Sequence, residues 1–171
     1  MMKTLAIGLM TATAAFAQTW TGEYQWTATD AEKAVIEKAV EDGAQQVGML
    51  VRSVARGRLK ESTKPFQKLT FAKTNETVTV VRDDDTPISG VADGTKIEWT
   101  RKDKKKFAVQ QTLVENVLTQ TFTDPDGNTR VNRHVFAEDG KTMSLEITLN
   151  SSSLKTPLKY ALSYKRPESK K

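Results

Sequence analysis

The chain contains no cysteine, and His134 is the only histidine among its 171 residues. Without cysteine there can be no disulfide, no thiolate metal site and no thiol for a lipid anchor, so the hydrophobic core must stabilise the fold alone. A single histidine excludes a histidine-based metal cluster. The G-x-S-x-G nucleophile motif is also missing. We therefore predict no catalytic residue, no metal site, no cofactor and no enzyme activity, and an enzyme built on His134 with an acidic partner is the least favoured alternative.

Long apolar runs are also scarce. The only candidate, residues 4–14, is too short for a membrane-spanning helix, which needs about 20 residues. The basic excess is modest, a formal net charge of +5, and its densest run, residues 102–106, falls between two strand-like segments. A nucleic-acid interface would need a basic face with interleaved aromatic residues. We therefore predict neither a membrane span nor nucleic-acid binding.

The first 17 residues have the three parts of a secretory signal peptide. Lys3 gives a positive start, residues 4–14 are uncharged and apolar, and Ala15-Phe16-Ala17 is an A-x-A cleavage site. Cleavage after Ala17 would place the mature protein in the periplasm or outside the cell. The alternative is an ordinary buried N-terminal helix.

The remainder is long enough for one domain with one core, which we assign to residues 18–166, with residues 167–171 as a disordered tail. Trp20, Tyr24 and Trp26 open it, and their even spacing would place all three rings on one face of a short strand. We expect them in the core.

A helix should follow. Thr29 and Glu32 form a capping box, and apolar residues then recur every three or four positions. The pattern predicts one long helix over residues 30–56, with Gly57 as its stop, although Gly43 and Gly48 weaken it and leave a break open.

From residue 66 onward the hydrophobic period changes from helical to two, which indicates strands. The alternating segments cover residues 66–73, 77–80, 96–100, 107–109, 118–122, 131–136, 143–149 and 158–165. Short turns rich in Asp, Asn and Gly join them, so the strands should form an antiparallel up-and-down meander. The predicted fold class is mainly β, with one long N-terminal helix and about eight strands curling into a lipocalin-like barrel. Such a barrel is either filled by its own side chains or holds one small ligand.

Two acidic clusters have the composition of turns. Residues 124–128 lack the glutamate that would complete an EF-hand loop, so we predict a hairpin turn there. Asp83, Asp84 and Asp85 form a solvated loop in our interpretation, with weak calcium binding as the alternative.

The candidate ligand-binding residues are three arginines and two aromatics. Arg52 and Arg56 are four residues apart and share one helix face, and Arg58 follows Gly57. Near a barrel mouth, these guanidinium groups would hold the carboxylate or phosphate of an amphipathic ligand. The alternative is a solvated helix end whose cations complement the helix dipole. Trp99 and Tyr160, from two of the strand segments, complete the candidate site.

The chain resembles the small lipocalin-like or fatty-acid-binding-like (calycin) barrels of bacterial envelopes. Trp20-Thr21-Gly22, the short hairpins and residues 158–164 carry this resemblance. Residues 138–145, 154–158 and 164–166 are similar to the ends of many bacterial secreted proteins. The early position of the helix departs from the lipocalin pattern, where the helix usually lies after or beside the last strands.

The function we expect is an exported binding protein for a small apolar or amphipathic ligand. The alternative is a non-catalytic structural or protein-interaction module of the envelope, with a filled barrel. The sequence does not indicate an oligomeric state.

The signal peptide makes a testable prediction. The intact mass of the protein recovered from outside the cytoplasm should correspond to a chain that begins at Gln18, because Ala17 occupies the last position of the cleavage site. A mass that still includes residues 1–17 would contradict cleavage and favour the buried helix.

Overall fold

The computed structural model describes residues 20–168. They form ten strands and two α-helices, with a short 3-10 helix between the helices. In chain order the elements are β1 (Gly22–Trp26), α1 (Asp30–Gln45), η1 (Met49–Val51), α2 (Arg52–Thr63), β2 (Lys68–Thr74), β3 (Thr77–Arg82), β4 (Ile88–Val91), β5 (Asp93–Thr100), β6 (Lys106–Val114), β7 (Val117–Thr123), β8 (Thr129–Phe136), β9 (Thr142–Asn150) and β10 (Leu158–Lys165). The signal-peptide prediction and residues 169–171 of the predicted tail lie outside the described residues.

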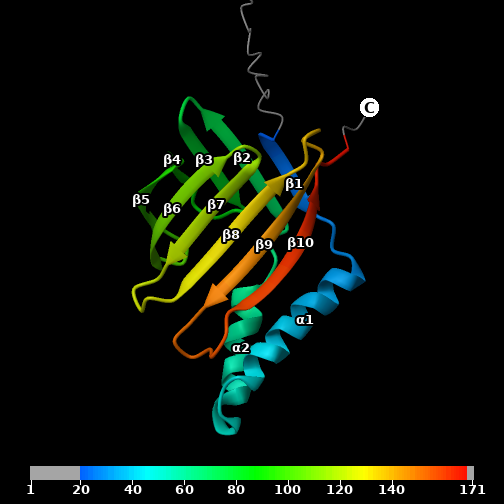
Figure 1. The fold of residues 1–171 in the computed structure, drawn as a ribbon, viewed down its shortest axis with the longest axis vertical. Helices are drawn as coiled ribbons and strands as arrows, with labels where there is room; N and C mark the ends of the chain where they lie inside the picture. Colours follow the sequence, from blue (N-terminus) through cyan, green and yellow to red (C-terminus); the bar gives the residue numbers. More distant parts are fainter. Residues whose placement is uncertain (1–19, 169–171) are drawn as a thin grey trace, which may run out of the picture.

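The ten strands form one antiparallel sheet in the order β4-β3-β2-β1-β10-β9-β8-β7-β6-β5. The sheet curls into a nearly closed barrel with the helices at one end (Figure 1). β1 lies between β2 and β10, so the first strand connects the two halves of the meander. All other neighbouring strands are consecutive in the chain, as short hairpins require.

Side chains close the seam between the edge strands β4 and β5. Gln111 on β6 donates through Nε2 to the carbonyl oxygens of Val78 on β3 (2.9 Å) and Gly90 on β4 (2.7 Å). A Cβ atom at Gly90 would lie only 2.5 Å from Cδ1 of Ile97 on β5, so this glycine lets the two strands approach closely. One polar and one apolar contact therefore take the place of a continuous hydrogen-bonded ladder at the seam.

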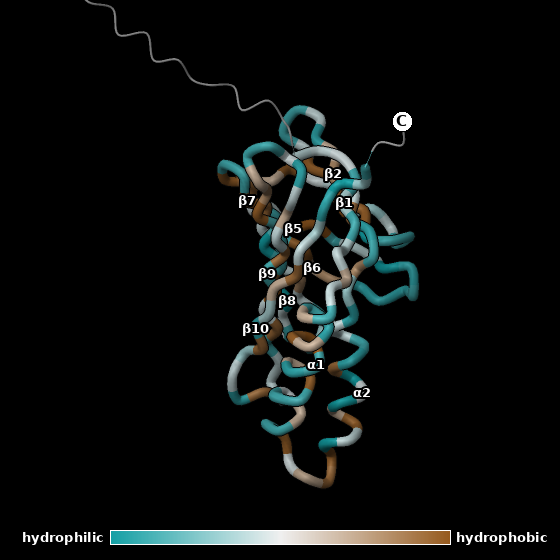
Figure 2. The backbone as a smooth tube through the Cα atoms, turned by 90° about the vertical axis from the view of Figure 1, so that its right-hand side faces the viewer, coloured by the Kyte–Doolittle hydropathy of each residue, from teal (hydrophilic) through white to brown (hydrophobic). Residues whose placement is uncertain are grey.

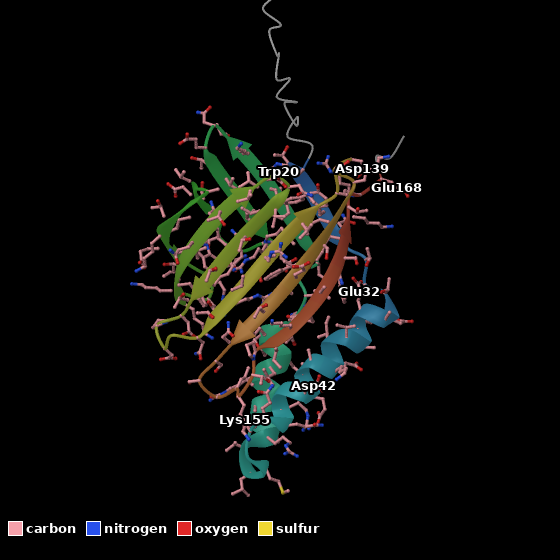
Figure 3. All side chains as sticks on the ribbon, viewed as in Figure 1. Trp20, Glu32, Asp42, Asp139, Lys155 and Glu168 are labelled. Carbon is pink, nitrogen blue, oxygen red and sulfur yellow. The ribbon has the colours of Figure 1, made fainter. Side chains whose placement is uncertain are left out.

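The inward side chains of the strands fill the barrel. Every second residue of β10, from Leu158 to Tyr164, is buried, as a half-buried strand requires. Trp20, Tyr24, Phe71 and Phe136 pack together, with the Trp20 and Phe136 ring centroids 5.2 Å apart. Trp20 lies at the end of the barrel away from the helices (Figure 3). The expected core positions of Trp20 and Tyr24 are confirmed, whereas Trp26 is only half-buried.

The prediction of a single helix over residues 30–56 is wrong. The capping box at Thr29 and Glu32 is present, but α1 ends at Gln45 and α2 folds back against it. Gly48 breaks the helix with an extended ψ of 148°. Gly43 permits the return, since a Cβ atom there would lie 2.8 Å from side-chain carbons of both Leu59 on α2 and Leu158 on β10. Apolar residues keep a helical spacing beyond the break because the residues after it form a second helix, α2, and this spacing concealed the break in the sequence.

The expected count of about eight strands is also wrong. The two additional strands are β1, which carries the early aromatic residues, and β4, in which only Ile88 is buried. A four-residue strand with one buried side chain has no alternation to detect. Asp93 and Gly94 have the composition of the turns that we expected between strands, but they lie inside β5, where the pairing register shifts between Asp93 and Lys96.

The turn between the helices exposes apolar side chains. Met49 is 81% exposed and Leu50 99% exposed, and Val51 and Val54 are also exposed. This segment is the hydrophobic tip that projects farthest from the barrel in Figure 2. Within residues 20–168, neither helix is long and apolar enough to cross a membrane.

The close packing at Gly43 can be tested by substitution. Gly43→Val should lower the free energy of unfolding by about 1–3 kcal/mol, because the new side chain overpacks the contact with Leu59 and Leu158. Gly57→Val is the matched control, since nothing lies within 4 Å of a Cβ atom at that position of α2. Urea unfolding of both variants measures the difference, and equal midpoints would show that the two helices do not pack at Gly43.

Candidate functional site

Polar and charged side chains enter the barrel from three neighbouring strands and from β3. On β8, Arg130, Asn132 and His134 alternate with outward residues and so point inward. Gln111 on β6, Gln120 on β7 and Arg82 at the end of β3 are also buried. Buried polar groups cost free energy unless they are hydrogen-bonded, so each needs an account of its partners.

Arg82 is buried among aromatic rings at the end of the barrel that faces α2. Its guanidinium carbon lies 4.5 Å from the ring centroid of Trp99, 4.8 Å from Phe122 and 4.9 Å from Phe66. The carboxylate of Asp85 is 3.6 Å away, and Nε of Arg82 has no hydrogen-bond partner in the part of the chain described. Burial, with the nearby charge of Arg130, lowers the pKa of Arg82 to about 10, and Asp85 opposes this only in part. The side chain stays charged at neutral pH, at a desolvation cost.

Arg130, the second residue of β8, lies beside the phenyl ring of Phe66. Its guanidinium carbon lies 5.1 Å from the ring centroid of Phe66, so Phe66 is in contact with both arginines. Nη1 donates to the carbonyl oxygen of Ser62 and Nε to Oδ1 of Asn132, both at 2.8 Å. Nη2 is buried, and no partner for it is found within residues 20–168. Burial lowers the pKa of Arg130, and the nearby Tyr160 and Tyr164 oppose this shift.

The segment from the end of α2 to the start of β2 lies across this end of the barrel. Its carbonyl oxygens accept hydrogen bonds from Arg130 at Ser62, from Tyr160 at Thr63 (3.5 Å) and from Tyr164 at Phe66 (2.9 Å). Asp83 holds the next two residues, because its Oδ1 accepts from the backbone N–H groups of Gln67 and Lys68. Burial raises the pKa of both tyrosines, which keeps their hydroxyl groups protonated as donors. We call Phe66, Arg82, Arg130, Tyr160 and Tyr164 the mouth cluster.

A solvent-open recess of about 400 Å³ adjoins the mouth cluster. It is lined by Phe66, Arg82, Asp83, Asp84, Asp85, Arg101, Lys102 and Asp103. Asp85 accepts from the backbone N–H groups of Thr86 and Lys102, and Arg101 pairs with Asp103. Asp83 and Asp85 belong to the loop that we predicted to be solvated. Their carboxylates accept hydrogen bonds from backbone N–H groups and so organise the turns around the recess. The recess leads from solvent to the buried Arg82.

Deeper in the barrel lies the interior polar row, which we define as Gln111, Gln120, Asn132 and His134. Gln120 donates to Oε1 of Gln111 at 3.1 Å. Oε1 of Gln120, Nδ2 of Asn132 and both ring nitrogens of His134 have no partner among the described residues. None of the four side chains is exposed, so the barrel is filled around them. Each unpaired buried group costs about 1–3 kcal/mol.

The candidate site residues from the sequence fall in two places. Trp99 contacts Arg82, and Tyr160 belongs to the mouth cluster, so the structure brings these two to the helix-covered end of the barrel. The three arginines lie on α2 instead. Arg56 pairs with Glu41 on α1, Arg58 is exposed, and Arg52 begins the helix beside the exposed tip. Their binding role stays a prediction.

Sequence reasoning missed Arg82 and Arg130. The alternation contained a usable signal, since Arg82 is in phase with the buried Val78 and Val80, and Arg130 is in phase with Asn132 and Phe136. An arginine at the end of a strand is normally exposed, so this phase alone would not have identified a buried charge.

The fold defines the class of protein that this chain resembles. A ten-stranded antiparallel barrel with a helix-turn-helix between its first two strands has the calycin, or lipocalin-like, fold of the fatty-acid-binding proteins. No protein-family model matches the sequence, and no curated protein matches it. The likeness is therefore one of structure.

Three solved structures illustrate the similarity. A lipid-binding protein of Caenorhabditis elegans in its apo form has a TM-score of 0.53 at 9% identity, covering 88% of this chain and 97% of its own. The fatty-acid-binding protein of Manduca sexta gives 0.52 at 10%, covering 86% and 99%. A Schistosoma mansoni fatty-acid-binding protein in complex with arachidonic acid gives 0.51 at 17%, covering 88% and 98%. At these identities the comparison shows the fold alone.

The buried histidine makes a testable pH prediction. Burial, followed by the charges of Arg82 and Arg130, lowers the pKa of His134 from 6.5 to about 3. Below pH 6.5 His134 is protonated in the unfolded chain but stays neutral in the folded protein. The free energy of unfolding therefore falls as the pH falls from about 6.5 to about 3. The contribution of His134 to this loss should be about 1.4 kcal/mol per pH unit.

Urea unfolding between about pH 7 and about pH 4.5 checks the slope. His134→Gln removes the titrating group, so the variant should lose less stability over this range than the native protein. Because there is no other histidine, the difference between the two slopes belongs to His134. Parallel slopes would mean that His134 titrates normally and has access to water.

Proposed function

We propose that this chain is an exported binding protein for a small apolar molecule that carries an acidic head group. The observation that carries the proposal is the pair of arginines at this end of the barrel, the buried Arg82 and the half-buried Arg130. Each retains a buried N–H group without a partner among the described residues, and Asp85 at 3.6 Å is the carboxylate paired with Arg82. A carboxylate or phosphate placed between them would supply both charge and hydrogen-bond acceptors.

The surroundings of the arginines suit the rest of such a ligand. Trp99, Phe122 and Phe66 provide an apolar wall beside Arg82, and the recess connects this wall to solvent. The aliphatic and aromatic interior beyond it matches an acyl chain. Since this interior is filled, binding requires its side chains to move apart as the ligand enters. The fatty-acid-binding fold and the arachidonic acid of the Schistosoma protein support this class of ligand.

Export is part of the proposal and is supported by the pattern of residues 1–17. The binding role needs no catalytic group, in agreement with a fold whose similar structures include fatty-acid-binding proteins.

Oleate is a suitable first probe. Calorimetric titration of the native protein should show binding, and Arg130→Gln and Arg82→Gln should each weaken it about tenfold or more, because a hydrogen bond to a charged group contributes about 1.5–3 kcal/mol. Oleyl alcohol, which has the same chain without the carboxylate, should bind weakly to the native protein and be little affected by either substitution.

Arg133→Gln is the matched control. It removes an arginine from the outward face of the same strand, where Arg133 pairs with Glu146 and is about half-exposed. Oleate affinity should not change in this variant. Oleate binding that is insensitive to Arg82 and Arg130, or the absence of binding, would refute the proposal.

The second candidate is a protein-interaction module with a filled barrel. The exposed tip favours it, because Met49, Leu50 and Val51 form an apolar patch at the end of the helix pair. Exposed apolar patches commonly mark interaction surfaces. Native mass spectrometry separates the two candidates: a bound molecule of a few hundred daltons supports the ligand, and an apo mass without oleate uptake supports the tip.

A further inference from the structure

The interior polar row lies on three adjacent strands in direct register. Gln111 on β6 is opposite Gln120 on β7, and Gln120 is opposite Asn132 on β8. Residues directly opposite in an antiparallel pair are about 4.5–5.5 Å apart at Cβ, so the row is one continuous polar surface. His134 extends it two residues farther along β8, with its ring edge against Phe71.

The members of the row differ in what they leave unpaired. Gln111 is fully engaged, because it donates to two backbone carbonyls and accepts from Gln120. Gln120 keeps a free acceptor and Asn132 a free donor, judged against all residues from 20 to 168. Neutral His134 offers one donor and one acceptor. The interior polar row therefore contains both unpaired hydrogen-bond donors and unpaired acceptors.

This mixture limits the chemistry that can complete it. A carboxylate accepts but does not donate, so it would leave Oε1 of Gln120 unpaired. An ammonium group donates but does not accept, so it would leave Nδ2 of Asn132 unpaired. An alkyl chain satisfies neither. A hydroxyl group both donates and accepts, and it is small enough to serve the facing side chains of Gln120 and Asn132 together.

The row also has a fixed relation to the proposed head-group site. Arg130, Asn132 and His134 are alternate residues on the inner face of β8, so each step along the row is about 6–7 Å. Arg130 and Asn132 are in addition linked by a hydrogen bond of 2.8 Å. A chain whose acid group lies at Arg130 would therefore run past Asn132 and then His134.

We propose that the interior polar row is a hydroxyl-binding subsite, so that the preferred ligand is a hydroxylated acyl chain. The inference rests on the proposed function, because it assumes that an acid group lies at Arg82 and Arg130. Sites that hydrogen-bond a substrate hydroxyl discriminate strongly against analogues that lack it, since the buried groups then stay unpaired. The row thus converts a general apolar site into a selective one.

The test compares octadecanoic acid with its 3-, 10- and 12-hydroxy derivatives by calorimetric titration of the mature protein. At least one hydroxy acid should bind about tenfold tighter than octadecanoic acid. Gln120→Leu should remove this preference and leave the affinity for octadecanoic acid unchanged or higher. Asn132→Leu should also remove the preference, measured as the ratio of the two affinities, because this variant deletes the acceptor of Arg130 as well and so changes the affinity for every acid. Gln110→Leu, on the outward face next to Gln111, should keep the preference.

A second measurement uses the native protein alone. The side-chain amide resonances of Asn132 and Gln120 should shift on binding of the preferred hydroxy acid and much less on binding of octadecanoic acid. Equal affinities for all four acids, or variants that weaken every acid alike, would overturn the subsite and leave the proposed function standing. Failure of all four acids to bind would instead refute the proposed function and, with it, the subsite.

Discussion

The contact of Phe66 with two guanidinium groups connects the helices, the barrel and the candidate site. The ring lies about 5 Å from both Arg82 and Arg130, and its backbone carbonyl accepts from Tyr164 on β10. Residues from β3, β8 and β10 therefore converge on one residue of the segment between α2 and β2. Cation-π contacts of this kind are strongest when water is excluded. Here they hold both guanidinium groups at the helix-covered end of the barrel, beside the solvent-open recess.

Those charges determine what the interior can accept. Burial is the main cause of the lowered pKa values of Arg82, Arg130 and His134, and the charges of the two arginines add to it at His134, so the interior beside them disfavours a further cation. An anion would be favoured at the same place, while an uncharged His134 leaves the deeper region polar but without net charge. Under the proposed function, the acidic group of the ligand would therefore lie at the two arginines and its neutral part deeper in the barrel.

The local patterns of the sequence predicted much of the fold, and the failures have physical causes. The capping box at Thr29 and the alternation in β10 depend on neighbouring residues alone, and both are present. The return of the chain after Gly48 depends on the packing of α1 against both α2 and β10 at Gly43, which a helical period does not contain. The inward turn of Arg82 and Arg130 depends on aromatic rings from Phe66, Trp99 and Phe122, which are distant in sequence. The alternation along the strands showed from sequence which face each arginine shares. It did not show the surrounding rings that stabilise a charge inside the barrel.

The unpaired groups in the interior polar row distinguish this barrel from one that is only filled. An apolar core of the same shape would be more stable than one with unpaired donors and acceptors, so Gln120, Asn132 and His134 lower the stability of the folded protein. A buried glutamine need not carry this cost. Gln111 in the same row closes the seam, and both of its donor N–H groups are hydrogen-bonded. Packing alone would favour leucine at the other three places. A hydroxyl group on the proposed ligand would pair with these side chains and offset that cost.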